Sequence, residues 1–131
     1  MRDKGPAERF LDGLGYRVGE PVFDPEQNVN LIMCHHDKQP AVEVIYPAKG
    51  PSPVDGLMAR HSDGLIYHAC YVSENLEASL SALDDARLRA VCVAPPKPAV
   101  LFGGSPVSFY QLVGMGVIEI IEGPIPPGFP A

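Results

Sequence analysis

The chain has 131 residues, of which 46% are hydrophobic and 20% are charged, and its formal net charge is −6. This balance favours one folded domain and argues against a disordered chain. An acidic chain without a Lys/Arg cluster argues against a nucleic-acid partner, and no apolar run approaches the roughly 20 residues of a membrane span.

The first residues of the chain and its cysteines indicate its location and redox state. The first ten residues, MRDKGPAERF, contain no apolar signal core, so we expect a cytoplasmic protein. Three widely spaced cysteines, with no CxxC pair among them, argue against a zinc ribbon or a thioredoxin-type site. We expect these thiols to be reduced and mostly buried; they are Cys34, Cys70 and Cys92.

The first part of the chain predicts a helix followed by three strands. The helix is expected over residues 5–14, because Pro6 suits a first helical turn and Gly15 suits a helix end. Runs rich in β-branched and aromatic residues, bounded by turn residues, predict strands over residues 16–23, 29–36 and 41–46.

A Pro/Gly-rich linker over residues 48–64, with one helical turn at 54–60, precedes a second set of elements. Asn75 is a favourable N-cap for a helix that reaches Ala86. Strands are expected before and after this helix, at 65–72, 88–93, 106–113 and 117–121. The stretch APPKPAVLFGG is expected to be a loop, and the tail 124–131 is too rich in proline for regular structure.

The order of these elements indicates an internal duplication. It reads αβββ, linker, βαβββ, which gives module one over residues 1–47 and module two over 65–123. We therefore predict a single α+β domain of two βαβββ modules, the first of which lacks its leading strand.

Three strands carry an ionisable residue on an otherwise apolar face, namely Glu43, His68 and Glu119. Burying an unpaired charge costs several kcal/mol, so these groups either meet a metal or line a wet cavity. Each also has an ordinary explanation, as a hydrogen-bonded core histidine or a solvated edge carboxylate. Imidazole nitrogen and carboxylate oxygen suit a divalent metal such as Zn, Co, Ni, Mn or Fe.

A second polar cluster, Cys34-His35-His36, lies at the end of a predicted strand. Adjacent residues on a strand point to opposite faces, so these side chains cannot easily serve one metal. We expect this cluster to run into solvent, and His61 to be exposed in the linker.

The segments AVEVIYP, LIYHACYV and VIEIIE, in this order, resemble three metal-bearing strands of the vicinal oxygen chelate (glyoxalase/bleomycin resistance/dioxygenase) superfamily. The segment LGYRVGEPVFDPEQNVNLIM resembles the region after the first helix of its methylmalonyl-CoA epimerase-like branch. The resemblance implies a half-open barrel around a divalent metal, with Glu43, His68 and Glu119 as three of four ligands. It implies metal stabilisation of an enolate, and we assign Glu119 a catalytic role.

The sequence departs from that family pattern at two positions. The usual fourth ligand belongs to a first strand that has no counterpart in this sequence. The strand position that carries the base carboxylate in the epimerases corresponds to Leu31, next to Asn30. Both departures argue against an unchanged epimerase mechanism.

Three hypotheses follow for the function. The first is a metal-dependent isomerase, epimerase or lyase of a small oxygenated metabolite or acyl thioester. The second is a metal-free protein that binds a small molecule, and the third is a fragment that needs its missing strand. A strand edge left open by that missing strand favours association, so we also expect a homodimer that buries surface near the strand of Glu43.

Overall fold

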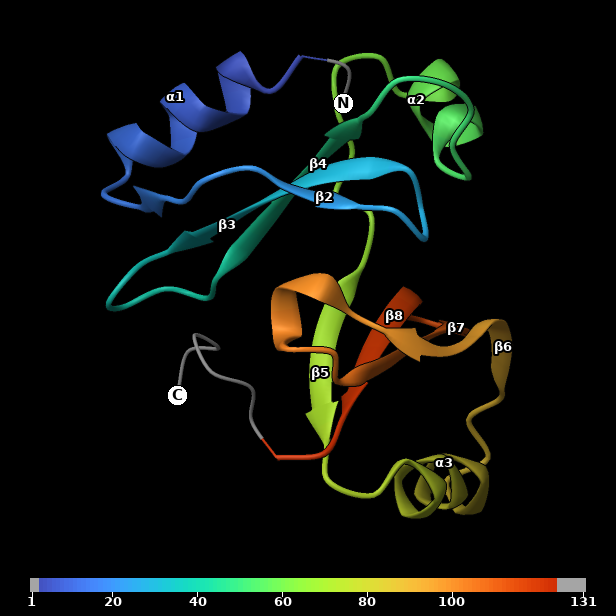
Figure 1. The fold of residues 1–131 in the computed structure, drawn as a ribbon. Helices are drawn as coiled ribbons and strands as arrows, with labels where there is room; N and C mark the ends of the chain where they lie inside the picture. The colour runs from blue at the N-terminus through green and yellow to red at the C-terminus, as the bar shows by residue number, and fades with distance from the viewer. Residues whose placement is uncertain (1–2, 125–131) are drawn as a thin grey trace. The chain divides into compact units, whose positions relative to one another are not determined.

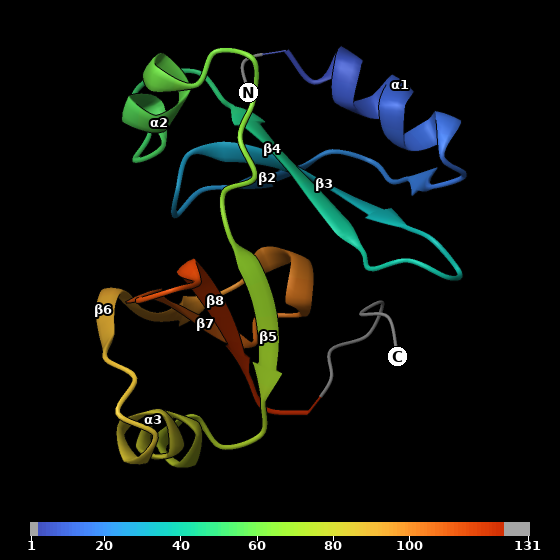
Figure 2. The ribbon, with the colours of Figure 1, turned by 180° about the vertical axis from the view of Figure 1, so that it is seen from behind.

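A computed structural model describes residues 3–124 of the chain, drawn from two sides in Figures 1 and 2. The chain divides into two compact units, whose described parts are residues 3–65 and residues 66–124, here called unit 1 and unit 2. Within residues 3–124, no helix has the length and apolar character needed to cross a membrane.

Unit 1 is an antiparallel sheet with one helix packed on it. The central strand β3 pairs with β4 on one side and with β1 and then β2 on the other. Its elements are α1 (Gly5–Gly13), β1 (Arg17–Val18), β2 (Val22–Asp24), β3 (Val29–His35), β4 (Val42–Pro47) and α2 (Asp55–Arg60).

The strand that we predicted over residues 16–23 is divided into β1 and β2. Gly19 lies at the division, and a Cβ there would meet the carbonyl oxygen of Met33 at 2.7 Å. Its amide nitrogen still donates to that oxygen, at 3.0 Å. Pro21 follows and has no N–H to continue the ladder. The close approach of Gly19 to β3 and the missing N–H of Pro21 therefore interrupt the strand. Both pieces, β1 and β2, still run antiparallel to β3.

The core of unit 1 lies between α1 and one face of the sheet. It is formed by buried Leu11, Tyr16, Ile32, Cys34 and Val44. Because side chains alternate along a strand, Glu43 and its cross-strand partner Met33 lie on the opposite face. Burial raises the pKa of the Cys34 thiol. The expectation of mostly buried thiols is wrong for the other two, because Cys70 is half-buried and Cys92 is exposed on an edge strand of unit 2.

Unit 2 is a mixed four-stranded sheet in the order β5-β8-β7-β6, in which β5 runs parallel to β8 and the other pairs are antiparallel. Figure 1 shows α3 below the sheet, connected to β5 and β6. The elements are β5 (Ala69–Ser73), α3 (Leu76–Asp85), β6 (Ala90–Pro98), the 3-10 helix η1 (Val100–Phe102), β7 (Pro106–Leu112) and β8 (Gly116–Glu122).

The helix of unit 2 begins and packs as its sequence predicts. The Asn75 side chain accepts a hydrogen bond from the amide of Ala78 at 3.0 Å, which confirms the expected N-cap. Leu76 and Leu80 then pack on a buried sheet face formed by Tyr110, Leu112, Ile118 and Ile120.

Two boundaries in unit 2 differ from the prediction. Strand β5 begins at Ala69, so Leu65 to His68 precede the strand and do not belong to it. Strand β6 continues to Pro98, although we predicted a loop after Val93. Because β6 is the edge strand and its register shifts between Ala94 and Lys97, the intervening prolines remove no hydrogen bond that the sheet requires.

The predicted repeat is present in the strand registers of the two units. Glu43 in β4 pairs with Met33 in β3, and Glu119 in β8 pairs with Phe109 in β7. The two units differ beyond that hairpin, because β5 lies parallel beside β8, whereas β4 has no second strand neighbour among residues 3–124. The α+β fold is confirmed, while the half-open barrel and the homodimer stay predictions. The proline-rich tail lies outside the described residues from 125 onward.

Candidate functional site

The structure brings two of the three candidate ligands together in unit 2. His68 lies just before β5, and Glu119 is the fourth residue of β8. Nε2 of His68 lies 3.5 Å from Oε1 of Glu119, and the two side chains are only 8% and 7% exposed. Ile118 and Ile120 face α3, so Glu119 between them points to the opposite face of the sheet.

Two aromatic rings contact the histidine of this pair. The centroid of the His68 ring lies 4.7 Å from that of Tyr67 and 5.2 Å from that of Phe109, and both contacts are edge-on. The Tyr67 and Phe109 rings are nearly parallel, with 12° between their planes. Burial, and then the charge of Glu119, raise the pKa of the Tyr67 phenol, so its hydroxyl stays protonated at neutral pH.

The geometry of His68 and Glu119 fits two ligands of one cation. Ligands about 2.1 Å from a tetrahedral metal lie about 3.4 Å from each other, close to the observed separation. That separation is too long for a strong hydrogen bond between the two groups. In addition, Nδ1 of His68 is buried and accepts or donates no hydrogen bond among the residues that the structure describes, which is unusual for a buried polar atom.

The third candidate, Glu43, belongs to unit 1. It is half-buried on β4, on the sheet face turned away from the α1 core, so it occupies the position in its unit that Glu119 occupies in the other. Neither unit, over the residues that the structure describes, gathers three His, Cys, Asp or Glu side chains fit to hold a metal. The convergence of all three residues stays a prediction.

The second polar cluster of the sequence has a structural role. Nδ1 of His36 accepts the Lys38 amide at 2.9 Å, so its Nε2 carries the hydrogen that faces the Leu14 carbonyl oxygen at 3.2 Å. The ring also packs against Tyr16. His36 therefore joins the end of α1 to the turn after β3, and Cys34 beside it is core.

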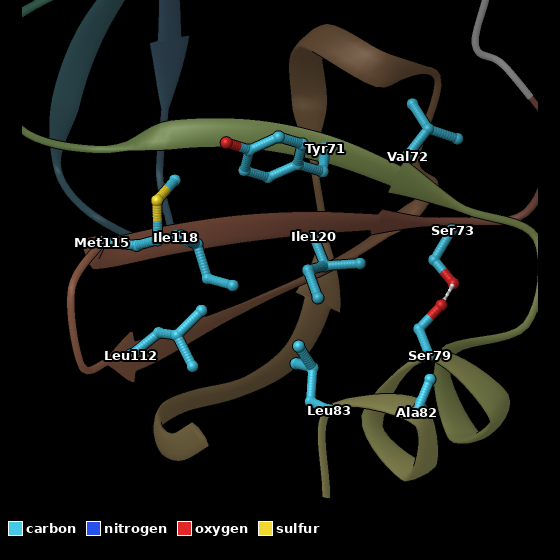
Figure 3. A pocket seen from close by; sticks show the side chains of 10 residues that line it. All are labelled: Tyr71, Val72, Ser73, Ser79, Ala82, Leu83, Leu112, Met115, Ile118 and Ile120. Atoms are coloured by element: carbon cyan, nitrogen blue, oxygen red, sulfur yellow. Dashed lines mark hydrogen bonds between the residues drawn. The ribbon is translucent and has the colours of Figure 1, made fainter. Parts of the chain in front are cut away.

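An apolar cavity of about 360 Å³ lies on the other face of the sheet of unit 2, between α3 and the edge strand β5 (Figure 3). Ile118 and Ile120 form part of its wall, and the hydroxyls of Ser73 and Ser79, 2.6 Å apart, lie at one end. Because Glu119 points to the opposite face, this cavity is separate from the His68–Glu119 pair.

The family model of the Glyoxalase/Bleomycin resistance protein/Dioxygenase superfamily matches residues 1–109. The chain belongs to this superfamily. The match ends before β8, so the family assignment does not itself cover Glu119.

Several relatives of this superfamily member are epimerases. It is 29% identical over 103 residues to an ethylmalonyl-CoA/methylmalonyl-CoA epimerase of Cereibacter sphaeroides, covering 79% of this chain and 75% of that protein. It is 26% identical over 80 residues to the mitochondrial methylmalonyl-CoA epimerase of Bos taurus, covering 61% of this chain and 45% of that protein. The match thus spans under half the length of the bovine protein.

Solved structures of epimerases share the fold. The methylmalonyl-CoA epimerase from Mycobacterium tuberculosis aligns with a TM-score of 0.73 at 16% identity, covering 95% of this chain and 83% of that one. A methylmalonyl-CoA epimerase in complex with methylmalonyl-CoA and NH4+ aligns with a TM-score of 0.68 at 17% identity, covering 95% and 90%. These comparisons confirm the family resemblance and the fold expected from the sequence.

The sequence analysis did not identify Tyr67 and Phe109 as neighbours of the site. The position of Tyr67 directly before His68 was available from the sequence, but the contact with Phe109 depends on the pairing of β7 with β8 and of β8 with β5.

Proposed function

We propose that this chain is a metal-dependent isomerase or epimerase that acts beside the carbonyl group of an acyl thioester. The observation that carries the proposal is the buried His68–Glu119 pair at 3.5 Å, in a fold whose named relatives are acyl-CoA epimerases. His68 and Glu119 would hold the cation, with Glu43 as a third ligand from unit 1. A cation bound there supplies Lewis-acid stabilisation of negative charge on a carbonyl oxygen.

The protein's own residues supply orientation and proton transfer. His68 is buried and its ring is enclosed by Tyr67 and Phe109, so its direction is set before a ligand arrives. Glu119 would accept the proton from the carbon beside the thioester carbonyl and pass it to water, while a proton from water added to the opposite face of the enolate would complete the inversion.

Glu119 is proposed as the base because the strand position that carries the base carboxylate in the epimerases holds a leucine in this chain. Leu31 stands there, 5% exposed, and a leucine side chain cannot accept a proton. If the reaction requires proton removal, another carboxylate must perform it. Glu119 is the buried carboxylate that lies next to a candidate ligand.

A metal-free binding protein of the same fold is the second candidate. The apolar side chain of Leu31 favours it, as does the presence of only two candidate ligands within unit 2. In that case His68 and Glu119 would bind a polar group of the small molecule directly, and the chain would catalyse no proton exchange.

Deuterium exchange separates the two candidates. The protein is incubated with a divalent metal and methylmalonyl-CoA in D2O, and mass spectrometry follows deuterium entering the substrate. The proposal predicts exchange well above the protein-free rate, and its loss in the Glu119→Gln variant, which keeps the size of the side chain. Exchange no faster than the protein-free rate would reject the enzyme and favour the binding protein.

A further inference from the structure

The two rings around His68 are placed in a way that restricts the imidazole. Tyr67 and Phe109 are nearly parallel, and the His68 ring stands at 81° to one and 88° to the other. The centroid separations of 4.7, 5.2 and 6.4 Å place the two rings on neighbouring sides of the imidazole, so each ring blocks its rotation in one direction. Edge-to-face contacts between aromatic rings also have a favourable geometry of their own.

The two rings come from different parts of the fold. Phe109 is buried on β7 and pairs with Glu119 in register, so it stands beside the carboxylate on the same sheet face. Tyr67 precedes β5 in the chain and is only half-buried. An extended strand would point adjacent residues to opposite faces. Because the strand starts only at Ala69, Tyr67 and His68 can both contact the same ring of Phe109.

We propose that Tyr67 and Phe109 act as an aromatic clamp that holds the His68 imidazole with Nε2 directed at Glu119. Both are positioning residues in this proposal, since they act through His68. The clamp performs the task that a hydrogen bond to the second ring nitrogen usually performs for a metal-binding histidine. Here that nitrogen, Nδ1, is buried and has no hydrogen-bond partner within residues 3–124, so packing fixes the ring instead.

The proposal has two consequences that can be separated. The first, a fixed imidazole, concerns the protein alone and requires no metal. The second, tighter metal binding, rests on the proposed function. Loss of an outer contact to a metal-binding histidine typically costs about 10- to 100-fold in affinity.

NMR of the metal-free protein tests the first consequence. The chemical shifts of the His68 ring protons should be displaced by the ring currents of Tyr67 and Phe109, relative to those of His61 in the linker. Tyr67→Phe should keep this shift because it keeps the ring, whereas Tyr67→Leu should reduce it. A His68 ring signal with the shift of an exposed histidine in the unmodified protein would overturn the clamp.

A Co2+ titration followed by visible absorption tests the second consequence. We expect Tyr67→Leu to weaken Co2+ binding at least about tenfold and to change the absorption band, while Tyr67→Phe leaves both unchanged. Equal affinity of Tyr67→Leu and the unmodified protein would overturn the link between clamp and metal. If no variant binds Co2+ but the ring shift is present, the clamp stands and the proposed metal-dependent function fails. Tyr67 is chosen for substitution because Phe109 is buried and its removal risks the fold.

Discussion

The two units of this chain repeat one hairpin but give it different neighbours. In unit 2, β5 lies parallel to β8, and the residue just before β5 meets the glutamate of β8. In unit 1, the equivalent glutamate of β4 has no second strand beside it among residues 3–124. The hairpin alone therefore supplies one carboxylate. The residue that precedes the parallel strand β5 supplies the histidine, and the two together form a candidate ligand pair.

The same comparison explains why the phenylalanine of unit 2 matters. Phe109 and Met33 occupy equivalent positions, each paired with a glutamate on the neighbouring strand. Phe109 encloses a histidine ring, whereas Met33 is a flexible side chain without that edge-on geometry. The two hairpins thus share the same backbone pairing but carry different side chains at this position.

The largest expected effect concerns the core of each unit. Ile32 in unit 1 and Ile121 in unit 2 are both 0% exposed. Replacing either by alanine should lower the free energy of unfolding by about 2–5 kcal/mol, because a cavity replaces packed methyl groups. Urea denaturation followed by circular dichroism measures this loss.

Ile66→Ala is the matched control for those two substitutions. Its side chain is 95% exposed, so the change should stay within about 0.5 kcal/mol. An Ile32→Ala variant as stable as the Ile66→Ala variant would show that unit 1 lacks the core described here. The Ile121→Ala variant tests the core of unit 2 in the same way.

A smaller effect distinguishes the two main helices. The Asn75 side chain caps α3, whereas Lys4, at the equivalent position of α1, makes no such bond. Asn75→Ala should cost about 1 kcal/mol of unfolding free energy, and Asn75→Asp, which keeps an accepting oxygen, should cost less. Equal losses in both variants would mean that the hydrogen bond to Ala78 does not carry the effect.

Local signals in the sequence predicted most of the fold. Asn75 marked the start of α3, and Gly114 and Gly116, both with positive φ, marked the turn between β7 and β8. The prolines of β6 led us to predict a loop where the strand continues. A strand tolerates proline where it lies at the edge of its sheet, as β6 does. Edge position is a property of the assembled sheet and cannot be read from the strand's own residues.

The sequence predicted that His68 and Glu119 belong to the candidate site, but the strand assigned to His68 was wrong. His68 was expected inside a strand over residues 65–72, yet the strand begins at Ala69 and the buried His68 side chain precedes it, next to Ile66, which is 95% exposed. The proximity of His68 to Glu119 arises from the parallel pairing of Cys70 with Glu119, a long-range contact. The partners Tyr67 and Phe109 depend on the same pairing, so alternation along one strand could not identify them.

Metal titration of three proteins tests the central claim most directly. Isothermal titration calorimetry with Zn2+ would compare the unmodified chain with His68→Ala and Glu43→Gln. We predict one ion per chain for the unmodified protein and no binding for His68→Ala, because the histidine is half of the ligand pair. Glu43→Gln should retain the ion about tenfold more weakly, a loss of about 1.4 kcal/mol. Zn2+ binding by His68→Ala with the affinity of the unmodified protein would contradict the account.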